Sequence, residues 1–130
     1  MAEMSDYLER SLLNATLNNT AFTTVATPYI SLHTADPTDA GTGTEVSGGS
    51  YARTAASFAT ASGTSGSVAT DADITFPTAT ASWGTVTHIG IWNASSAGDL
   101  LYHTALDSSK TIDSGDIFKI TSGNLTVTLA

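Results

Sequence analysis

The sequence predicts an all-β protein: a single small antiparallel β-sandwich or barrel-like domain with a short N-terminal helix. Three observations support this fold class. Seven or more short segments rich in Thr, Val, Ile, Tyr and Phe show period-two patterning. Turn-forming residues separate these segments about every 8–12 residues, as in sandwiches and small barrels. The length of 130 residues suits one domain.

The composition indicates a thin core. Thr, Ser and Ala number 23, 16 and 19, whereas Leu, Ile, Val and Phe together number only 26 of 130 residues. Such a small share of large apolar side chains lies near the limit at which burial offsets the entropy lost on folding. Charged residues make up only 12%, which argues against a highly charged disordered chain. We therefore expect a Thr-rich β domain that neighbouring molecules help to complete.

A helix is expected only at the start of the chain, over residues 5–17. Ser5 or Asp6 can cap it, and Asp6 with Glu9 makes a capping box that suits the positive end of the helix dipole. Its apolar stripe is narrow and consists of Leu8, Leu12, Leu13 and Leu17. Such a stripe is equally compatible with two arrangements. The helix could lie on the domain, or it could be an arm that anchors to a partner. Residues 1–24 are accordingly assigned to an N-terminal helix or arm, and residues 25–130 to the β domain.

The β pattern begins after residue 22. In the first strand, Ile30 and Leu32 share one face, and Tyr29, Ser31 and His33 share the other. The predicted strands are 29–34, 51–60, 74–76, 86–92, 100–106, 117–121 and 125–129, with a short segment at 110–112.

Pairings follow from the connections between these strands. We expect 86–92 and 100–106 to be antiparallel neighbours, and 117–121 and 125–129 to form a hairpin around residues 122–124. Residues 35–50 and 59–72 have the composition of flexible loops.

Charge excludes some partners. The net charge is −8 and only four residues are cationic, so the cationic face that nucleic acid requires is missing and an anionic membrane surface is disfavoured. No apolar run is long enough to span a bilayer, and no signal peptide is recognisable. The absence of cysteine excludes disulfides and Cys-ligated metal sites.

Catalytic and cofactor motifs are not found. The glycine-rich segments lack the Lys-Ser/Thr ending of a phosphate-binding loop, and no Gly-x-Ser-x-Gly motif is present. His33, His88 and His103 could together bind zinc, but ordinary strand positions explain them better. Paired aspartates in loops could bind calcium, but turn chemistry accounts for them. We therefore assign no enzyme activity, no cofactor and no metal.

The aromatic residues allow two interpretations. Core packing is favoured for Trp83 and Trp92, and anchoring at a protein interface is the alternative. By the same enrichment of Tyr and Arg at interfaces, Tyr51 and Arg53 make the best candidate for an exposed contact pair. A carbohydrate platform is a further alternative, because Trp and Tyr stack on sugars.

Nearly the whole chain, residues 5–129, resembles a family of small proteins encoded among the structural genes of tailed bacteriophages. The matching stretches are residues 29–53, Phe76–Pro77, Trp83–Trp92, Gly98–Tyr102, Ser114–Asp116 and the closing hairpin. Members are labelled head decoration (cement) or tail-fibre-like proteins. The matching motifs are turn and strand signatures without catalytic residues. The resemblance therefore implies a virion component and leaves its position on the particle open.

Among these positions we expect capsid decoration, because a fibre shaft would show repeats or heptads and this chain shows neither. The protein would stabilise the head by non-covalent contacts with the major capsid protein, on the outer capsid surface and as a trimer. A tail-associated or receptor-binding module is the alternative, followed by a lectin or carbohydrate-active enzyme. Predicted contact regions are the helix and the loops at 35–50 and 59–72. The predicted contact residues are Tyr7, Leu8, Leu12, Asp36, Asp39, Glu45, Tyr51 and Arg53.

Overall fold

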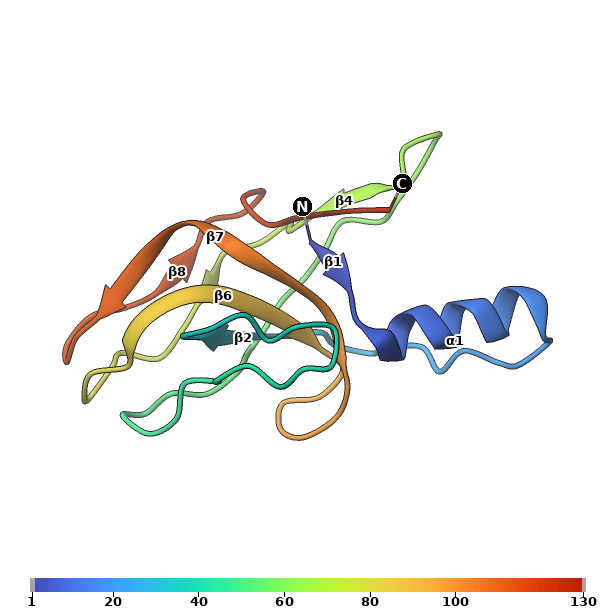
Figure 1. Cartoon of the computed structure of the whole chain (residues 1–130). Helices are drawn as coiled ribbons and strands as arrows, with labels where there is room; N and C mark the ends of the chain where they lie inside the picture. Colours follow the sequence, from blue (N-terminus) through green and yellow to red (C-terminus); the bar gives the residue numbers. More distant parts are fainter. Residues whose placement is uncertain (1, 130) are drawn as a thin grey trace.

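A computed structural model of the chain describes residues 2–129 and shows a β-rich body from which one helix projects (Figure 1). The elements are β1 (Glu3–Met4), α1 (Asp6–Leu17), β2 (Tyr29–His33), β3 (Thr54–Ala55), β4 (Ser67–Ala69), β5 (Ile74–Thr75), β6 (Gly84–Trp92), β7 (Leu100–Ile112), β8 (Lys119–Ile120) and β9 (Thr126–Thr128). This confirms the predicted all-β class with a short N-terminal helix.

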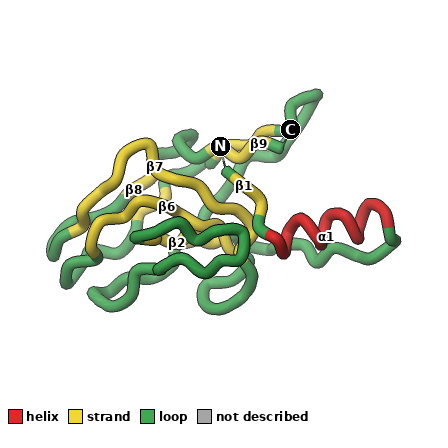
Figure 2. Tube along the Cα trace, viewed as in Figure 1, coloured by secondary structure: helices red, strands yellow, loops and turns green. Residues whose placement is uncertain are grey.

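The main sheet has five strands in the order β1-β7-β6-β2-β3, and every neighbouring pair is antiparallel. Two further sheets have two strands each, β4-β9 and β5-β8. Figure 2 shows that loops and turns connect most of the strands, as the many turn-forming residues require. Among the described residues, no helix has the length and apolar character that a membrane crossing needs.

The predicted antiparallel pairing of residues 86–92 with 100–106 is confirmed by β6 and β7. β7 continues to Ile112, so the short segment predicted at 110–112 is the end of the same strand. The register shifts between Val86, which lies opposite Lys110, and His88, which lies opposite Ala105. The residues between Ala105 and Lys110 therefore form a bulge, which the period-two pattern does not reveal.

The hairpin predicted from residues 117–121 and 125–129 is wrong. β8 pairs with β5 and β9 pairs with β4, so the two strands join different sheets. Thr70 separates them: its N–H donates to the carbonyl of Leu125, and its carbonyl accepts from Gly123 N–H. The turn at 122–124 therefore bonds to a distant segment instead of closing a local ladder.

The strand predicted at 51–60 shrinks to Thr54–Ala55. On one side of it, Tyr51 and Arg53 direct their side chains into polar contacts with Glu45. On the other side, Phe58 forms only an isolated bridge with Thr70. The predicted loop at 59–72 contains β4, and the loop at 35–50 is tied back to the sheet by Thr34 N–H to Thr44 O and Val46 N–H to Leu32 O.

The core lies against one face of the main sheet. Ile30 is opposite Ile91 and Leu32 is opposite Ile89, and all four are at most 3% exposed. An aromatic cluster completes this core: Tyr51 meets the edge of Trp83, and Phe76 meets Phe118 at a ring distance of 5.6 Å. Trp83 is buried in this core, which confirms the core prediction for it. Trp92 is buried too, but outside this cluster, where it contacts Ser31 and Arg53.

The N-terminal helix is an arm attached at one end. Ser5 caps it, with its hydroxyl accepting from Leu8 N–H, and Leu8 is buried against the body. Farther along, the helix leaves the sheet (Figure 1), and Leu13 and Leu17 are 56% and 74% exposed. The body therefore buries only the start of the leucine stripe.

Candidate functional site

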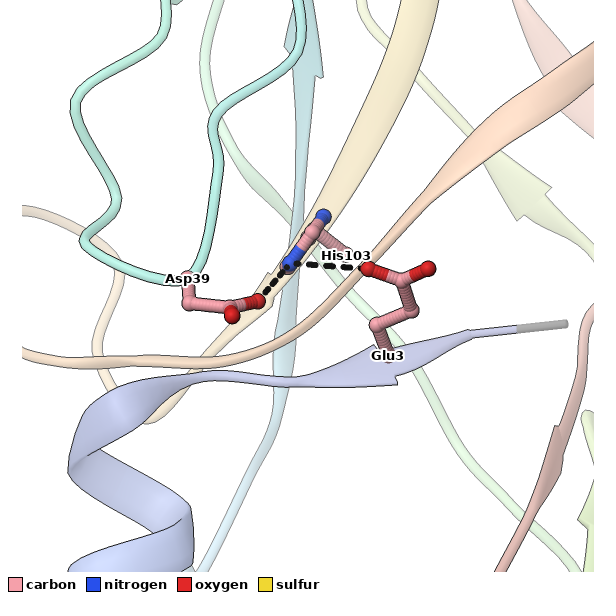
Figure 3. A group of neighbouring side chains, drawn as sticks. All are labelled: Glu3, Asp39 and His103. Atoms are coloured by element: carbon pink, nitrogen blue, oxygen red, sulfur yellow. Dashed lines mark hydrogen bonds and ion pairs between the residues drawn. The ribbon is translucent and has the colours of Figure 1, made fainter.

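Four titratable residues meet at the root of the arm and form the His103 cluster, which consists of Glu3, Asp36, Asp39 and His103. Glu3 on β1 lies directly opposite His103 on β7, and Asp39 approaches from the loop after β2 (Figure 3). His103 Nε2 lies 2.8 Å from Asp39 Oδ1 and 3.9 Å from Glu3 Oε2. On the other side of the ring, Nδ1 lies 3.4 Å from Asp36 Oδ1. Three carboxylates thus surround one imidazole.

Local turn chemistry brings the two aspartates to the histidine. Asp36 Oδ1 accepts the N–H of Thr38, and the carbonyl of Pro37 accepts from Thr42 at 2.7 Å, which reverses the chain. The carbonyl of Asp39 then accepts the N–H of Asp6 at 3.0 Å, so the same loop holds the start of α1. The geometry of the cluster is therefore coupled to the position of the arm.

Burial differs sharply within the cluster. The His103 side chain is only 5% exposed, whereas those of Asp39 and Glu3 are 50% and 72% exposed. A buried imidazole with carboxylates at its rim can be held as an ion pair or can bind a metal ion, because His nitrogen and carboxylate oxygen are both common ligands. Glu3, Asp39 and His103 place one ligand atom each within 4.8 Å of one another.

A second polar group lies on the same face of the sheet, beneath the 35–50 loop. Trp92 Nε1 donates to the Ser31 hydroxyl at 2.7 Å, and that hydroxyl bonds His33 Nε2 at 2.7 Å. His33 is fully buried, and its Nδ1 has no hydrogen-bond partner. Burial lowers the pKa of His33 below its ordinary value, because the charged ring would lose its hydration.

A third group fixes the start of the 51–60 segment. Arg53 holds Glu45 through Nε to Oε2 and Nη2 to Oε1, both at 2.9 Å, and its guanidinium lies 3.8 Å from the centre of the Trp92 ring. The Tyr51 hydroxyl donates to Glu45 at 2.6 Å and accepts from Leu32 N–H. Burial alone would raise the pKa of Glu45, but these hydrogen bonds and the Arg53 charge outweigh it and hold the pKa below its usual range.

This placement corrects the prediction that Tyr51 and Arg53 form an exposed pair. The Arg53 side chain is 8% exposed, and Nη1 also donates to the carbonyls of Ala97 and Ala94. Arg53 and Glu45 therefore make an intramolecular ion pair. Its two parallel hydrogen bonds satisfy the hydrogen-bonding groups of the guanidinium and of the carboxylate where little water reaches them.

The other predicted contact residues lie at two places. Tyr7 and Leu12 are half-buried on α1, Leu8 is buried, and Asp36 and Asp39 are exposed at the His103 cluster. Contact with a partner stays a prediction for all of them.

No sequence pattern points to Glu3 or to the cluster around His103. His33 and His88 are opposite each other in the β2–β6 register, but the described residues contain no three-histidine group close enough for one ion. Glu3 lies in a strand of two residues, which is too short to show a period-two pattern. Asp39 is 64 residues from His103 in the sequence, so no local motif links them. The pairing of β1 with β7 brings Glu3 to His103, and the turn after β2 brings Asp39.

Comparison with known proteins bears on nearly the whole chain. The sequence model of a family described as Podophage GP4 fiber I protein gp80 matches residues 3–128. No curated protein matches the chain.

Proposed function

Because the chain belongs to the family of podophage GP4 fiber I protein gp80 and is a structural protein of a bacteriophage virion, we propose that it forms part of a virion fibre. The predicted resemblance to small virion proteins of tailed phages is confirmed at this level. The match over residues 3–128 carries the proposal, since the family description names a fibre protein. On this proposal the protein acts by non-covalent contact and not by catalysis.

The helical arm supplies the attachment on this proposal. It leaves the β body at one end only (Figure 1), and it presents Leu13 and Leu17 to solvent. Exposed leucines on a projecting helix favour burial against a partner helix or groove. The β body would stay outside the contact that the arm makes and would offer a second surface for contact. The whole chain, body and arm together, has a net charge of −8.

Capsid decoration is the second candidate. The absence of repeats or heptads favours it, because an elongated shaft is normally built from repeated units. In that role the chain would bind the major capsid protein on the outer surface of the head, as the predicted trimer.

The copy number of the chain in purified virions, measured by quantitative mass spectrometry against the major capsid protein, separates these candidates. We expect far fewer copies than of the shell protein, with density at fibres in a cryo-EM reconstruction. A copy number comparable to that of the shell protein would overturn the fibre proposal in favour of decoration. Absence from the particle would overturn both.

A further inference from the structure

We propose that Glu3, Asp39 and His103 bind a divalent transition-metal ion, with zinc as the representative ion, at the root of the helical arm. The ligands would be His103 Nε2, Asp39 Oδ1 and Glu3 Oε2, drawn in Figure 3. This site does not rest on the fibre proposal, because it is argued from the positions of these side chains and not from the place of the chain in the virion, although Asp36 and Asp39 are also among the predicted contact residues.

The distances suit an ion after small movements. Zinc binds His nitrogen and carboxylate oxygen at about 2.0–2.2 Å, which places neighbouring ligand atoms about 3.3 Å apart in a tetrahedron. The distance from Nε2 is 2.8 Å to Asp39 Oδ1 and 3.9 Å to Glu3 Oε2. Asp39 must therefore move out slightly and Glu3 must move in. Both side chains are at least half exposed and can make these shifts, whereas the buried His103 ring provides a fixed ligand.

Asp36 adds an observation on the opposite side of the ring. Its Oδ1 lies 3.4 Å from Nδ1, the nitrogen that faces away from Glu3 and Asp39. Nε2 bonds Asp39 Oδ1 at 2.8 Å, and because a carboxylate only accepts, Nε2 is the donor in that bond. Once an ion takes the place of that proton, Nδ1 carries the ring proton beside Asp36, and the lone pair of Nε2 points toward the other two carboxylates. Carboxylate–histidine–metal arrangements of this kind orient the imidazole and strengthen metal binding. On binding, the metal replaces any proton at Nε2, and that proton is released to solvent.

The donor set selects the class of ion. An imidazole nitrogen favours zinc and its neighbours in the transition series, whereas calcium and magnesium prefer oxygen ligands only. Three protein ligands leave a fourth position for water or for a residue of a partner. The ion would tie β1 and the loop carrying Asp39 to β7, where Ser5 N–H already bonds the carbonyl of Leu101 at 2.9 Å.

Isothermal titration calorimetry of the untagged full chain with zinc chloride, after removal of metal by a chelator, tests the proposal. We expect one ion per chain, no saturable binding of calcium or magnesium, and a measured binding enthalpy that changes with the ionisation enthalpy of the buffer, which reports the released proton. Glu3→Gln removes a ligand from an exposed position without endangering the fold, and it should weaken binding more than tenfold. Asp36→Asn should weaken binding about 10–100-fold through the orientation of His103. Asp71→Asn, an exposed charge-matched control away from the cluster, should bind like the wild type.

Four results would contradict the proposed metal site or its assignment. Failure of the wild-type chain to bind zinc, or zinc binding that Glu3→Gln leaves unchanged, would overturn the proposal and leave His103 as an ion-paired histidine. Equal or tighter binding of calcium would overturn the assignment to a transition metal. With cobalt as the probe, the visible absorption of a tetrahedral site should appear in the wild type and in Asp71→Asn. Absence of this absorption from both proteins would also contradict the proposed metal site. None of these results bears on the copy number in virions.

Discussion

Arg53 shows how much one residue can organise in a thin-cored protein. Its side chain contacts Glu45, two backbone carbonyls and the face of Trp92, and so it connects three segments that are distant in the sequence. The pair with Glu45 is largely removed from solvent, with side chains 8% and 25% exposed. Removing one partner of such a pair leaves the other charge without compensation, which costs more than the intact pair contributes.

We expect Arg53→Met to lower the free energy of unfolding by about 3 kcal/mol. Urea denaturation followed by Trp fluorescence measures this change. Lys119→Met is the matched control, because Lys119 pairs with Asp73 at the surface, where both side chains are about half exposed. The control should unfold almost like the wild type, and equal effects of the two variants would contradict the structural role of Arg53.

His33 should make the stability of the protein depend on pH. Because burial lowers its pKa, the unfolded chain takes up a proton at a higher pH than the folded chain does. The stability contributed by neutral His33 is therefore present above the unfolded pKa of about 6.5 and is lost as the pH falls below it.

Urea midpoints measured between about pH 7 and 5 should fall with decreasing pH, and His33→Gln should flatten that dependence. Glu45, whose pKa is held below its usual range, adds acid sensitivity only at lower pH, so the two effects separate. A wild-type midpoint that does not change over this range would refute the assignment.

At the scale of elements, β6 requires a residue without a side chain at position 90. A Cβ added to Gly90 would lie 2.7 Å from the Ser31 hydroxyl and 2.9 Å from Leu100 Cδ1. The Ser31 hydroxyl, on the neighbouring strand β2, links Trp92 Nε1 to His33 Nε2, so a side chain at position 90 would press on this polar chain.

Gly90→Ala should therefore lower the free energy of unfolding by about 1–3 kcal/mol, the usual range for overpacking. Gly48→Ala separates this effect from backbone strain: Gly48 has a φ of +77° but has no atom within 4 Å of an added Cβ. We expect Gly90→Ala to be the more destabilising in thermal unfolding. A neutral Gly90→Ala would show that the side chains of Ser31 and Leu100 can move aside without cost.

The start of α1 depends on Ser5. Its hydroxyl accepts from Leu8 N–H and donates to the carbonyl of Leu100, so one side chain both caps the helix and fastens it to β7. Ser5→Ala should cost about 2 kcal/mol, through loss of the cap and an unsatisfied buried carbonyl.

Hydrogen exchange should locate the effect of Ser5→Ala in the first turn of α1. Ser11→Ala, within the same helix, should be neutral or slightly stabilising, because alanine favours the helix interior. Unchanged protection of the first turn in Ser5→Ala would show that the arm is held by other contacts.

At the scale of the whole molecule, the arm and the body have different roles. Leu8 belongs to the core, but Leu13 and Leu17 contact little of their own chain. Stability and attachment should therefore respond to different substitutions on the same helix.

We expect Leu13→Ser with Leu17→Ser to leave the Tm of the isolated chain almost unchanged and to reduce its incorporation into virions. The Tm is measured by calorimetry, and incorporation by mass spectrometry of particles from a complementation assay. Leu8→Ala, which removes a buried side chain, should instead lower the stability by about 2–5 kcal/mol. Normal incorporation of the double variant would argue that the body, not the arm, makes the attachment.

The local features of the fold can be predicted from single stretches of the sequence. The capped helix from Asp6, the shared face of Ile30 and Leu32, and the β6–β7 pairing all follow from short-range patterns. A cap, a period of two and a turn each involve residues that are close along the chain, so their physics can be read from a single segment.

Which distant segments meet depends on the complete tertiary structure. It paired β8 with β5 and β9 with β4, buried the Arg53 side chain against Glu45, and brought Glu3 and Asp39 to His103. Strands this short and this rich in Thr and Ser fit several partners almost equally well in their local pattern. Burial of the few large apolar side chains, together with satisfaction of the buried polar groups, selects among those pairings, and both conditions involve the whole fold at once.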